Sequence, residues 1–214
     1  MPAMSVEIWL LYTVAAIGLS LTPGPNGLLA LTHGMRYGLR PTVFTVAGGV
    51  CGFMLVIAVS MAGMGALLAA SEQAFTIAKW IGGAYLVYLG IKTWRAPAPQ
   101  VKNESSAGSE PGVSSWQTSG QLMSQGFFVA ASNPKALIFF AAFLPQFIDT
   151  AAPQLPQFLI LGGTFGVIEF IYELVLAGTA GRLAPWLGRK GRLFNKAAGA
   201  TFVGIGGLLA TVQR

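Results

Sequence analysis

Apolar residues gather in six long runs, and short polar segments separate them. A helix crosses the roughly 30 Å hydrocarbon core of a bilayer in about 20 residues. Each run is long enough to cross once, the shortest with little tilt. The pattern predicts an all-α integral membrane protein with six transmembrane helices, at about 8–31, 43–70, 75–91, 121–147, 158–180 and 196–212.

Composition agrees with this prediction. Hydrophobic residues make up 54% of the 214-residue chain and charged residues 9%, whereas a soluble domain carries about 25% charged residues. One transmembrane domain over residues 1–214 accounts for the length. We expect the lipid bilayer to be its surroundings.

Charge in the loops predicts the orientation. Cytoplasmic loops of membrane proteins collect Lys and Arg. Here the odd-numbered loops are basic and the even-numbered ones are not, so we expect the odd loops in the cytoplasm and both termini outside. The same placement explains the net charge of +6, so no nucleic-acid partner is needed. The basic residues in question are Arg36, Arg40, Lys92, Arg95, Lys102, Arg182, Arg189, Lys190 and Arg192.

The segment 96–116 differs from the rest of the chain. It is rich in Pro, Ser, Gly and Glu, a composition that cannot bury apolar area and is typical of a flexible linker. It divides the chain into halves at about 1–95 and 117–214, with three predicted spans in each.

The two halves repeat each other. GGxxG begins at Gly48 and again at Gly162, and similar Lys- and Gly-containing segments begin at Lys79 and Lys196. An odd number of spans per repeat makes the second half enter the membrane from the opposite side. This is the inverted repeat found in many secondary transporters. We expect the GxxxG-like spacings themselves to serve close helix packing.

Prolines interrupt the first and fourth predicted spans at corresponding places. Proline lacks an N–H and clashes with the preceding turn, so it breaks or kinks a helix. Paired interruptions in two repeats point to a binding site at the midplane, and the helix that follows each break offers free N–H groups to a carboxylate. A packing kink is the alternative. The candidate substrate-binding residues are Thr22, Pro23, Gly24, Pro25, Asn26, Ser132, Asn133, Pro134 and Lys135.

Two acids lie inside the fifth predicted span, Glu169 and Glu173, four residues apart on one helical face. A charge inside the bilayer is costly and is by default a functional hypothesis. Two carboxylates this close repel each other, so they are candidates for carrying a proton or for binding a substrate ammonium group. Glu173 also fits a structural role at the interface or beside Lys135, and Lys135 fits either a substrate carboxylate or a glutamate. We expect His33 at the membrane interface.

The motifs LTPGPN, KWIGGAYLVYLGIK and NPKALIFFAAFLPQF resemble those of the LysE/RhtB amino-acid exporters, in the same order and over nearly the whole chain. The resemblance implies a protein of the bacterial inner membrane that exports amino acids, driven by the proton gradient. The second half is similar to the homoserine, threonine and leucine branch, which favours neutral amino acids. Glu173 departs from the family pattern.

Two other functions stay open at this point. The same scaffold suits export of a cation or another small metabolite. A polytopic membrane enzyme is disfavoured, because the sequence offers no nucleophile–base pair. With one Cys and one His, we expect neither a metal site nor a cofactor, and no phosphate loop indicates nucleotide-driven pumping. The oligomeric state is not determined by the sequence.

Overall fold

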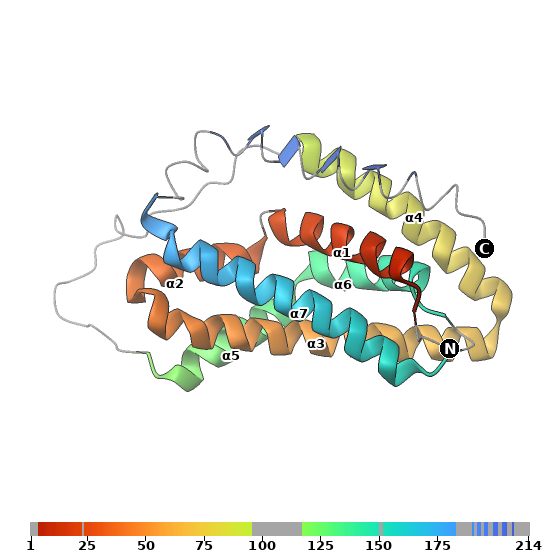
Figure 1. Ribbon diagram of the computed structural model, residues 1–214, viewed down its shortest axis with the longest axis horizontal. Helices are drawn as coiled ribbons and strands as arrows, with labels where there is room; N and C mark the ends of the chain where they lie inside the picture. The colour runs from red at the N-terminus through yellow and green to blue at the C-terminus, as the bar shows by residue number, and fades with distance from the viewer. Residues whose placement is uncertain are drawn as a thin grey trace.

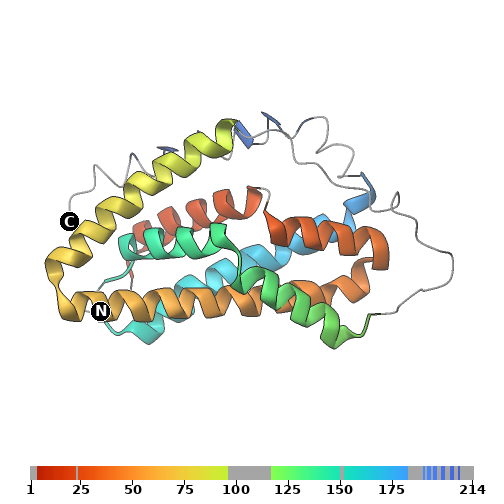
Figure 2. The ribbon, with the colours of Figure 1, turned by 180° about the vertical axis from the view of Figure 1, so that it is seen from behind.

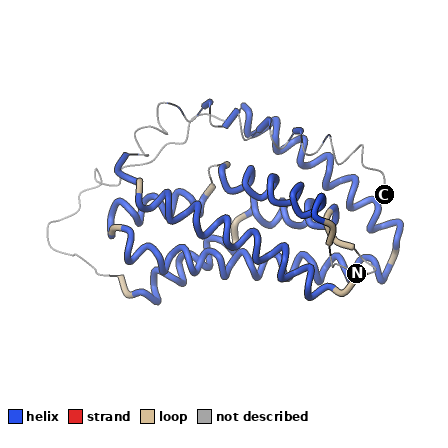
Figure 3. Tube along the Cα trace, in the orientation of Figure 1, coloured by secondary structure: helices blue, strands red, loops and turns tan. Residues whose placement is uncertain are grey.

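The computed structural model describes residues 4–22, 24–95, 117–149, 152–182 and scattered residues between 190 and 207. This part of the chain is helical and contains no strand (Figure 3). In chain order the elements are α1 (Val6–Leu21), α2 (Pro25–Tyr37), α3 (Leu39–Ala70), α4 (Glu72–Arg95), α5 (Ser119–Ala131), α6 (Pro134–Phe143), the short 3-10 helix η2 (Leu144–Gln146) and α7 (Gln154–Gly178).

The two predicted interruptions are confirmed as breaks between helices. The first predicted span consists of α1 and α2, whose axes are bent by 55°, and the fourth consists of α5 and α6, bent by 51°. Pro25 and Pro134 each occupy the first turn of the helix after the break, where the missing N–H of proline leaves no bond unmade. Pro23 lies outside the described residues.

Among the described helices, α3 and α7 are long and apolar enough to cross a membrane, and each bent pair would add one more span. The third predicted span coincides with α4, a helix of 24 residues, which is not among them. Most of the sixth predicted span and the whole of the linker 96–116 lie outside the described residues. The arrangement of six spans as two inverted repeats stays a prediction.

The long helices α3 and α7 run along the length of the molecule, with the broken pairs beside them (Figures 1 and 2). Two helices contact the N-terminal part of α3. They are α2, which follows the first break, and α5, which precedes the second. The other two, α1 and α6, lie at the opposite end. The breaks themselves therefore lie near the middle of the bundle.

Glycines bring α3 and α5 into backbone contact. A Cβ on Gly48 would overlap the carbonyl group of Met123, and one on Gly126 would overlap the carbonyl oxygen of Thr45. Gly52 likewise faces the carbonyl of Phe127. Small residues allow this approach because they leave backbone against backbone. The packing role expected for Gly48 and Gly52 is confirmed.

Aromatic side chains fill the end of the bundle where α1 and α6 lie. The ring of Phe143 lies 4.4 Å from those of Phe139 and Phe147 and 5.9 Å from that of Tyr12. The hydroxyl of Tyr12 donates to the carbonyl oxygen of Leu161 on α7 at 3.0 Å, so that the one polar atom of this buried ring is satisfied. This apolar cluster fixes α1, α6 and α7 around the breaks.

Candidate functional site

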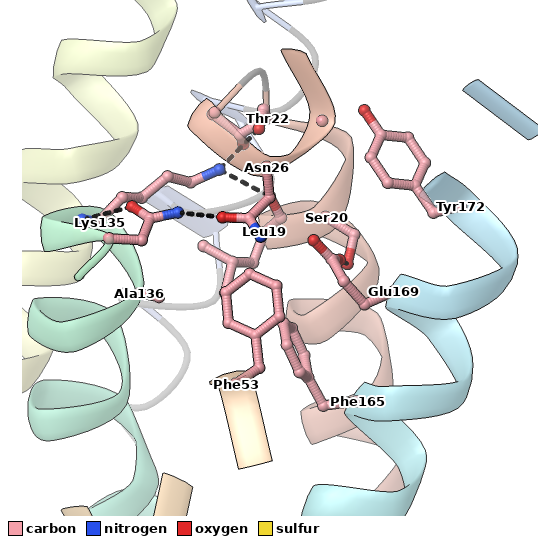
Figure 4. A pocket seen from close by; sticks show the side chains of 13 residues that line it. Leu19, Ser20, Thr22, Asn26, Phe53, Lys135, Ala136, Phe165, Glu169 and Tyr172 are labelled. Carbon is pink, nitrogen blue, oxygen red and sulfur yellow. Dashed lines mark hydrogen bonds between the residues drawn. The ribbon is translucent and has the colours of Figure 1, made fainter. Parts of the chain in front are cut away.

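The two breaks meet in the interior. Asn133, which precedes α6, donates from Nδ2 to Oδ1 of Asn26 in the first turn of α2, at 3.2 Å. The two side chains are 5% and 4% exposed, although 107 residues separate them in the sequence. Buried amides are stable when they are hydrogen-bonded, so this contact ties one interrupted helix to the other (Figure 4).

The break between α5 and α6 is closed by its own side chains. Oδ1 of Asn133 accepts the backbone N–H of Lys135 at 3.0 Å and so caps α6. The hydroxyl of Ser132 donates to the carbonyl oxygen of Phe128, at 2.5 Å, within α5. Ser132 and Pro134 are exposed on the outside of the bundle.

The break between α1 and α2 is closed by its own side chains on the α1 side only, where the hydroxyl of Thr22 donates to the carbonyl oxygen of Gly18 at 2.8 Å. Gly24 precedes α2 and offers no side chain, so the first turn of α2 lacks a side-chain cap. The free end of α1 is occupied instead by Lys135 from α6. Its Nζ donates to the carbonyl oxygens of Leu19, at 2.9 Å, and Thr22, at 2.6 Å. The sequence predicted a substrate carboxylate or a glutamate beside Lys135; its hydrogen bonds go to two backbone carbonyls, and its charge interacts with that of Glu169.

Glu169 faces the first break from α7. It is 6% exposed, and one carboxylate oxygen, Oε2, accepts a hydrogen bond from the hydroxyl of Ser20 in the last turn of α1. Figure 4 shows Lys135 and Glu169 directed toward the break from opposite sides, one from α6 and the other from α7. The broken end of α1 thus lies between a cation and an acid.

Glu173 lies one turn beyond Glu169 and is only 1% exposed. Its Oε1 has no hydrogen-bond partner among the residues that the structure describes. Its Oε2 and the Nδ2 of Asn26 both lie close to Gly49, 3.4 and 3.2 Å from where a Cβ would stand. Glycine at this position therefore leaves room for a carboxyl group and an amide at the junction of α2, α3 and α7.

A small pocket opens where these elements meet. One wall is polar and carries the groups described above. The other is apolar and is formed by side chains from α1, α3, α6 and α7. The lining consists of Leu19, Ser20, Thr22, Gly24, Asn26, Gly27, Phe53, Asn133, Lys135, Ala136, Phe165, Glu169 and Tyr172.

Five of the predicted substrate-binding residues line this pocket: Thr22, Gly24, Asn26, Asn133 and Lys135. Three of the others, Pro25, Ser132 and Pro134, are exposed and absent from the lining. Of the two acids, Glu169 lines the pocket and Glu173 is not among its lining residues.

Sequence reasoning missed seven pocket residues: Leu19, Ser20, Gly27, Phe53, Ala136, Phe165 and Tyr172. A signal was available for two of them. Phe165 and Tyr172 lie four residues before and three after Glu169, so that all three share one face of a helix. Nothing in the sequence marks Phe53 or Ser20, because their place depends on how α1 and α3 pack.

The interfacial position expected for His33 stays a prediction, and the structure adds which elements surround this side chain. It is 7% exposed, and its Nδ1 lies 2.8 Å from the hydroxyl oxygen of Thr45 on α3. Its ring also meets that of Tyr37, 5.2 Å away and nearly perpendicular. His33 is thus a buried, partnered side chain between α2 and α3, and it does not line the pocket.

Comparison with known proteins gives consistent relatives. Residues 17–213 match the family described as LysE type translocator. The chain is 36% identical to a homoserine/homoserine lactone efflux protein of Salmonella typhimurium, over 98% of this chain and 99% of the relative. It is 31% identical to a leucine efflux protein of Klebsiella pneumoniae, over 96% and 95%. It is 34% identical to a membrane protein of Vibrio cholerae, over 98% and 100%.

No solved structure matches significantly. The relatives with a named activity are efflux proteins and not enzymes.

Proposed function

Because this chain belongs to the LysE family of translocators, we propose that it is a secondary transporter that exports a neutral amino acid from the cytoplasm and takes up protons in exchange. One observation carries the proposal: two interrupted helices meet at a buried pocket that holds hydrogen-bonding amides, a cation and an acid. Interrupted helices at membrane depth are tolerated where they line a cavity.

The substrate carboxylate suits the start of α2. The first N–H groups of a helix have no partner within the helix and form its positive end. Here no side chain caps them. The amides of Asn26 and Asn133 lie beside this end and add donors. Pro25, at the first helical position, removes a donor that the ligand would not need.

The substrate side chain suits the apolar wall. Phe53 and Phe165 meet edge to face, with ring centroids 5.3 Å apart, and Leu19 and Ala136 continue the same surface. A charged side chain would lose its hydration against this wall and gain no partner in return, whereas an uncharged one avoids that cost. The names of the relatives, homoserine and leucine efflux proteins, support this reading.

The coupling proton suits Glu169 and Glu173. Both carboxyl groups are buried, and one oxygen of Glu173 lacks a partner among the described residues. A buried carboxylate is costly unless a partner or a proton neutralises it. The two acids are one turn apart on α7. Protonation of one acid can therefore compensate a change in charge beside the other. Export of a cation or another small metabolite by the same two acids is the competing function.

Loop charge supports the orientation, with odd loops in the cytoplasm and both termini outside, in a bacterial inner membrane. Reporter fusions test it. A reporter active only in the cytoplasm should give signal when fused in the linker after Ser106 and none when fused after Arg214. Signal at both places would contradict the odd number of spans in each half.

Transport itself is tested in inverted membrane vesicles, whose outer face is the cytoplasmic one. With an acidic vesicle interior, we expect uphill uptake of leucine or homoserine that collapses when the pH gradient is dissipated. Lysine and inorganic cations serve as the comparison. Gradient-driven uptake of a cation without any uptake of amino acids would favour the competing function.

A further inference from the structure

One ammonium group and two carbonyl oxygens make a close polar contact at the first break. Nζ of Lys135 lies 2.6 Å from the carbonyl oxygen of Thr22 and 2.9 Å from that of Leu19. The last carbonyls of a helix have no intrahelical partner and form its negative end. The end of α1 is therefore a place that attracts a cation with N–H donors.

This place is part of the pocket wall. Leu19, Thr22 and Lys135 line the pocket, and so does Glu169. The carboxyl of Glu169 bonds to Ser20, in the same last turn of α1. Carbonyl oxygens accept from an ammonium group while a nearby carboxylate balances its charge. The chemistry of this corner is that of a primary-ammonium site.

Lys135 reaches the corner from the other half of the chain. It stands in the first turn of α6, and its side chain passes over Gly24, with Nζ 3.6 Å and Cδ 3.7 Å from where a Cβ would lie. Its backbone N–H is bonded by Asn133, whereas its ammonium donates, among the described residues, to the carbonyl oxygens of Leu19 and Thr22. The side chain can therefore leave without loss of the α6 cap.

We propose that the carbonyl oxygens of Leu19 and Thr22 form a primary-ammonium site that Lys135 fills in this structure and that the substrate's ammonium group fills during transport. The inference rests on the proposed export of an amino acid. Ammonium and carboxylate are attached to the same carbon in such a substrate. A carboxylate held at the start of α2 therefore brings its ammonium near the end of α1, and the displaced Lys135 meets that carboxylate.

Chemical rescue tests the site without any transport. Lys135→Ala removes the ammonium and leaves its space, so thermal unfolding of the purified variant should begin at a lower temperature than that of the wild type. Ethylammonium should recover part of the loss. Tetramethylammonium has the same charge but no N–H donor, and it should recover none. Lys92→Ala, which removes an ammonium at the far end of α4, is the matched control and should respond to neither.

Equal effects of the two cations on Lys135→Ala, or no effect of either, would overturn the proposal. If this variant does not survive extraction, Lys135→Gln provides a second measurement. Its amide can still donate to the carbonyls but carries no charge, so a primary amine should displace it more easily than it displaces lysine. We expect isoamylamine to stabilise this variant at about tenfold lower concentration than the wild type. An equal or higher concentration contradicts the site.

The two proposals fail separately. If the wild type exports an amino acid but no primary amine restores Lys135→Ala, the ammonium site is wrong and the function stands. If amines restore the variant but vesicles of the wild type take up no amino acid, the site stands and the function is wrong.

Discussion

The two helix breaks differ in how their free backbone groups are satisfied. In both, a hydroxyl closes the last turn before the break, from Thr22 in one and from Ser132 in the other. At the break before α6, Asn133 also caps the following helix with its own side chain. At the break before α2, the N-cap residue is Gly24, which has no side chain to offer. The carbonyls on its other side are bonded by Lys135, which comes from the opposite half.

From this difference we expect one break to have a structural role and the other to bind the substrate. A break that caps itself has little to gain from a ligand, because its polar groups are already bonded. A break that relies on a movable side chain and leaves its N–H groups uncapped can exchange those partners for a substrate. The break between α5 and α6 thus brings Asn133 and Lys135 to the pocket. Under the proposed function we expect the substrate to bind at the break between α1 and α2, the receiving break.

The largest expected effect is at the acid that faces the receiving break. Glu169→Gln keeps the shape and an oxygen acceptor for Ser20 but cannot carry a proton. We expect uphill export driven by a pH gradient to fall by at least about tenfold, while exchange of labelled amino acid at equal pH continues. Asp149→Asn, an acid outside the bundle interior, is the control. If exchange falls as much as uphill export, Glu169 binds the substrate ammonium instead.

Alanine substitutions of the asparagines at the two breaks should distinguish an effect on stability from an effect on substrate binding. Asn133→Ala loses both the contact with Asn26 and the cap of α6, and a lost cap costs about 1 kcal/mol. Asn26→Ala loses only the contact. We expect the melting temperature of Asn133→Ala to lie about 2–4 °C below that of Asn26→Ala, with a raised KM for export in both. Equal melting temperatures would mean that the cap contributes nothing.

Proline substitutions should act more strongly at the receiving break. The residue before a proline is held in an extended conformation; Gly24 has φ −141° and ψ 176°. Asn133 is also extended, but its side-chain cap holds it there without proline. We therefore expect Pro25→Ala to reduce export several-fold and Pro134→Ala to reduce it less, measured at equal amounts of folded protein. The reverse order would show that the second break depends on its proline.

Serine substitutions give the smallest expected difference. Ser20→Ala removes the hydroxyl that bonds Glu169. It should lower export about two- to fivefold, which corresponds to a loss of about 0.5–1 kcal/mol, the net contribution of a typical hydrogen bond. Ser132→Ala removes an exposed hydroxyl bonded within its own helix. Its export and melting temperature should match those of the wild type. A transport defect in Ser132→Ala would extend the site to the outside of the second break.

The sequence predicted the breaks because proline acts locally, within one turn of helix. It also predicted that the glycines at positions 48 and 52 serve packing. It could not predict that Asn26 bonds Asn133, or that Lys135 bonds carbonyls of α1, because those contacts join residues more than 100 positions apart. Nor could it predict that His33 faces Thr45 on α3, because the position of a residue along a helix does not tell which neighbouring helix its side chain meets.

The contact between α3 and α5 has a consequence for motion. Gly48 and Gly52 lie directly against the backbone of α5, and Gly126 lies against that of α3. Separation of these two helices would therefore leave a void between them. Yet α3 belongs to the first half of the chain and α5 to the second. For the proposed exporter, this contact argues against alternating access by rocking of one half of the chain against the other. We expect α3 and α5 to move together, and the movement to take place at the broken helices within each half.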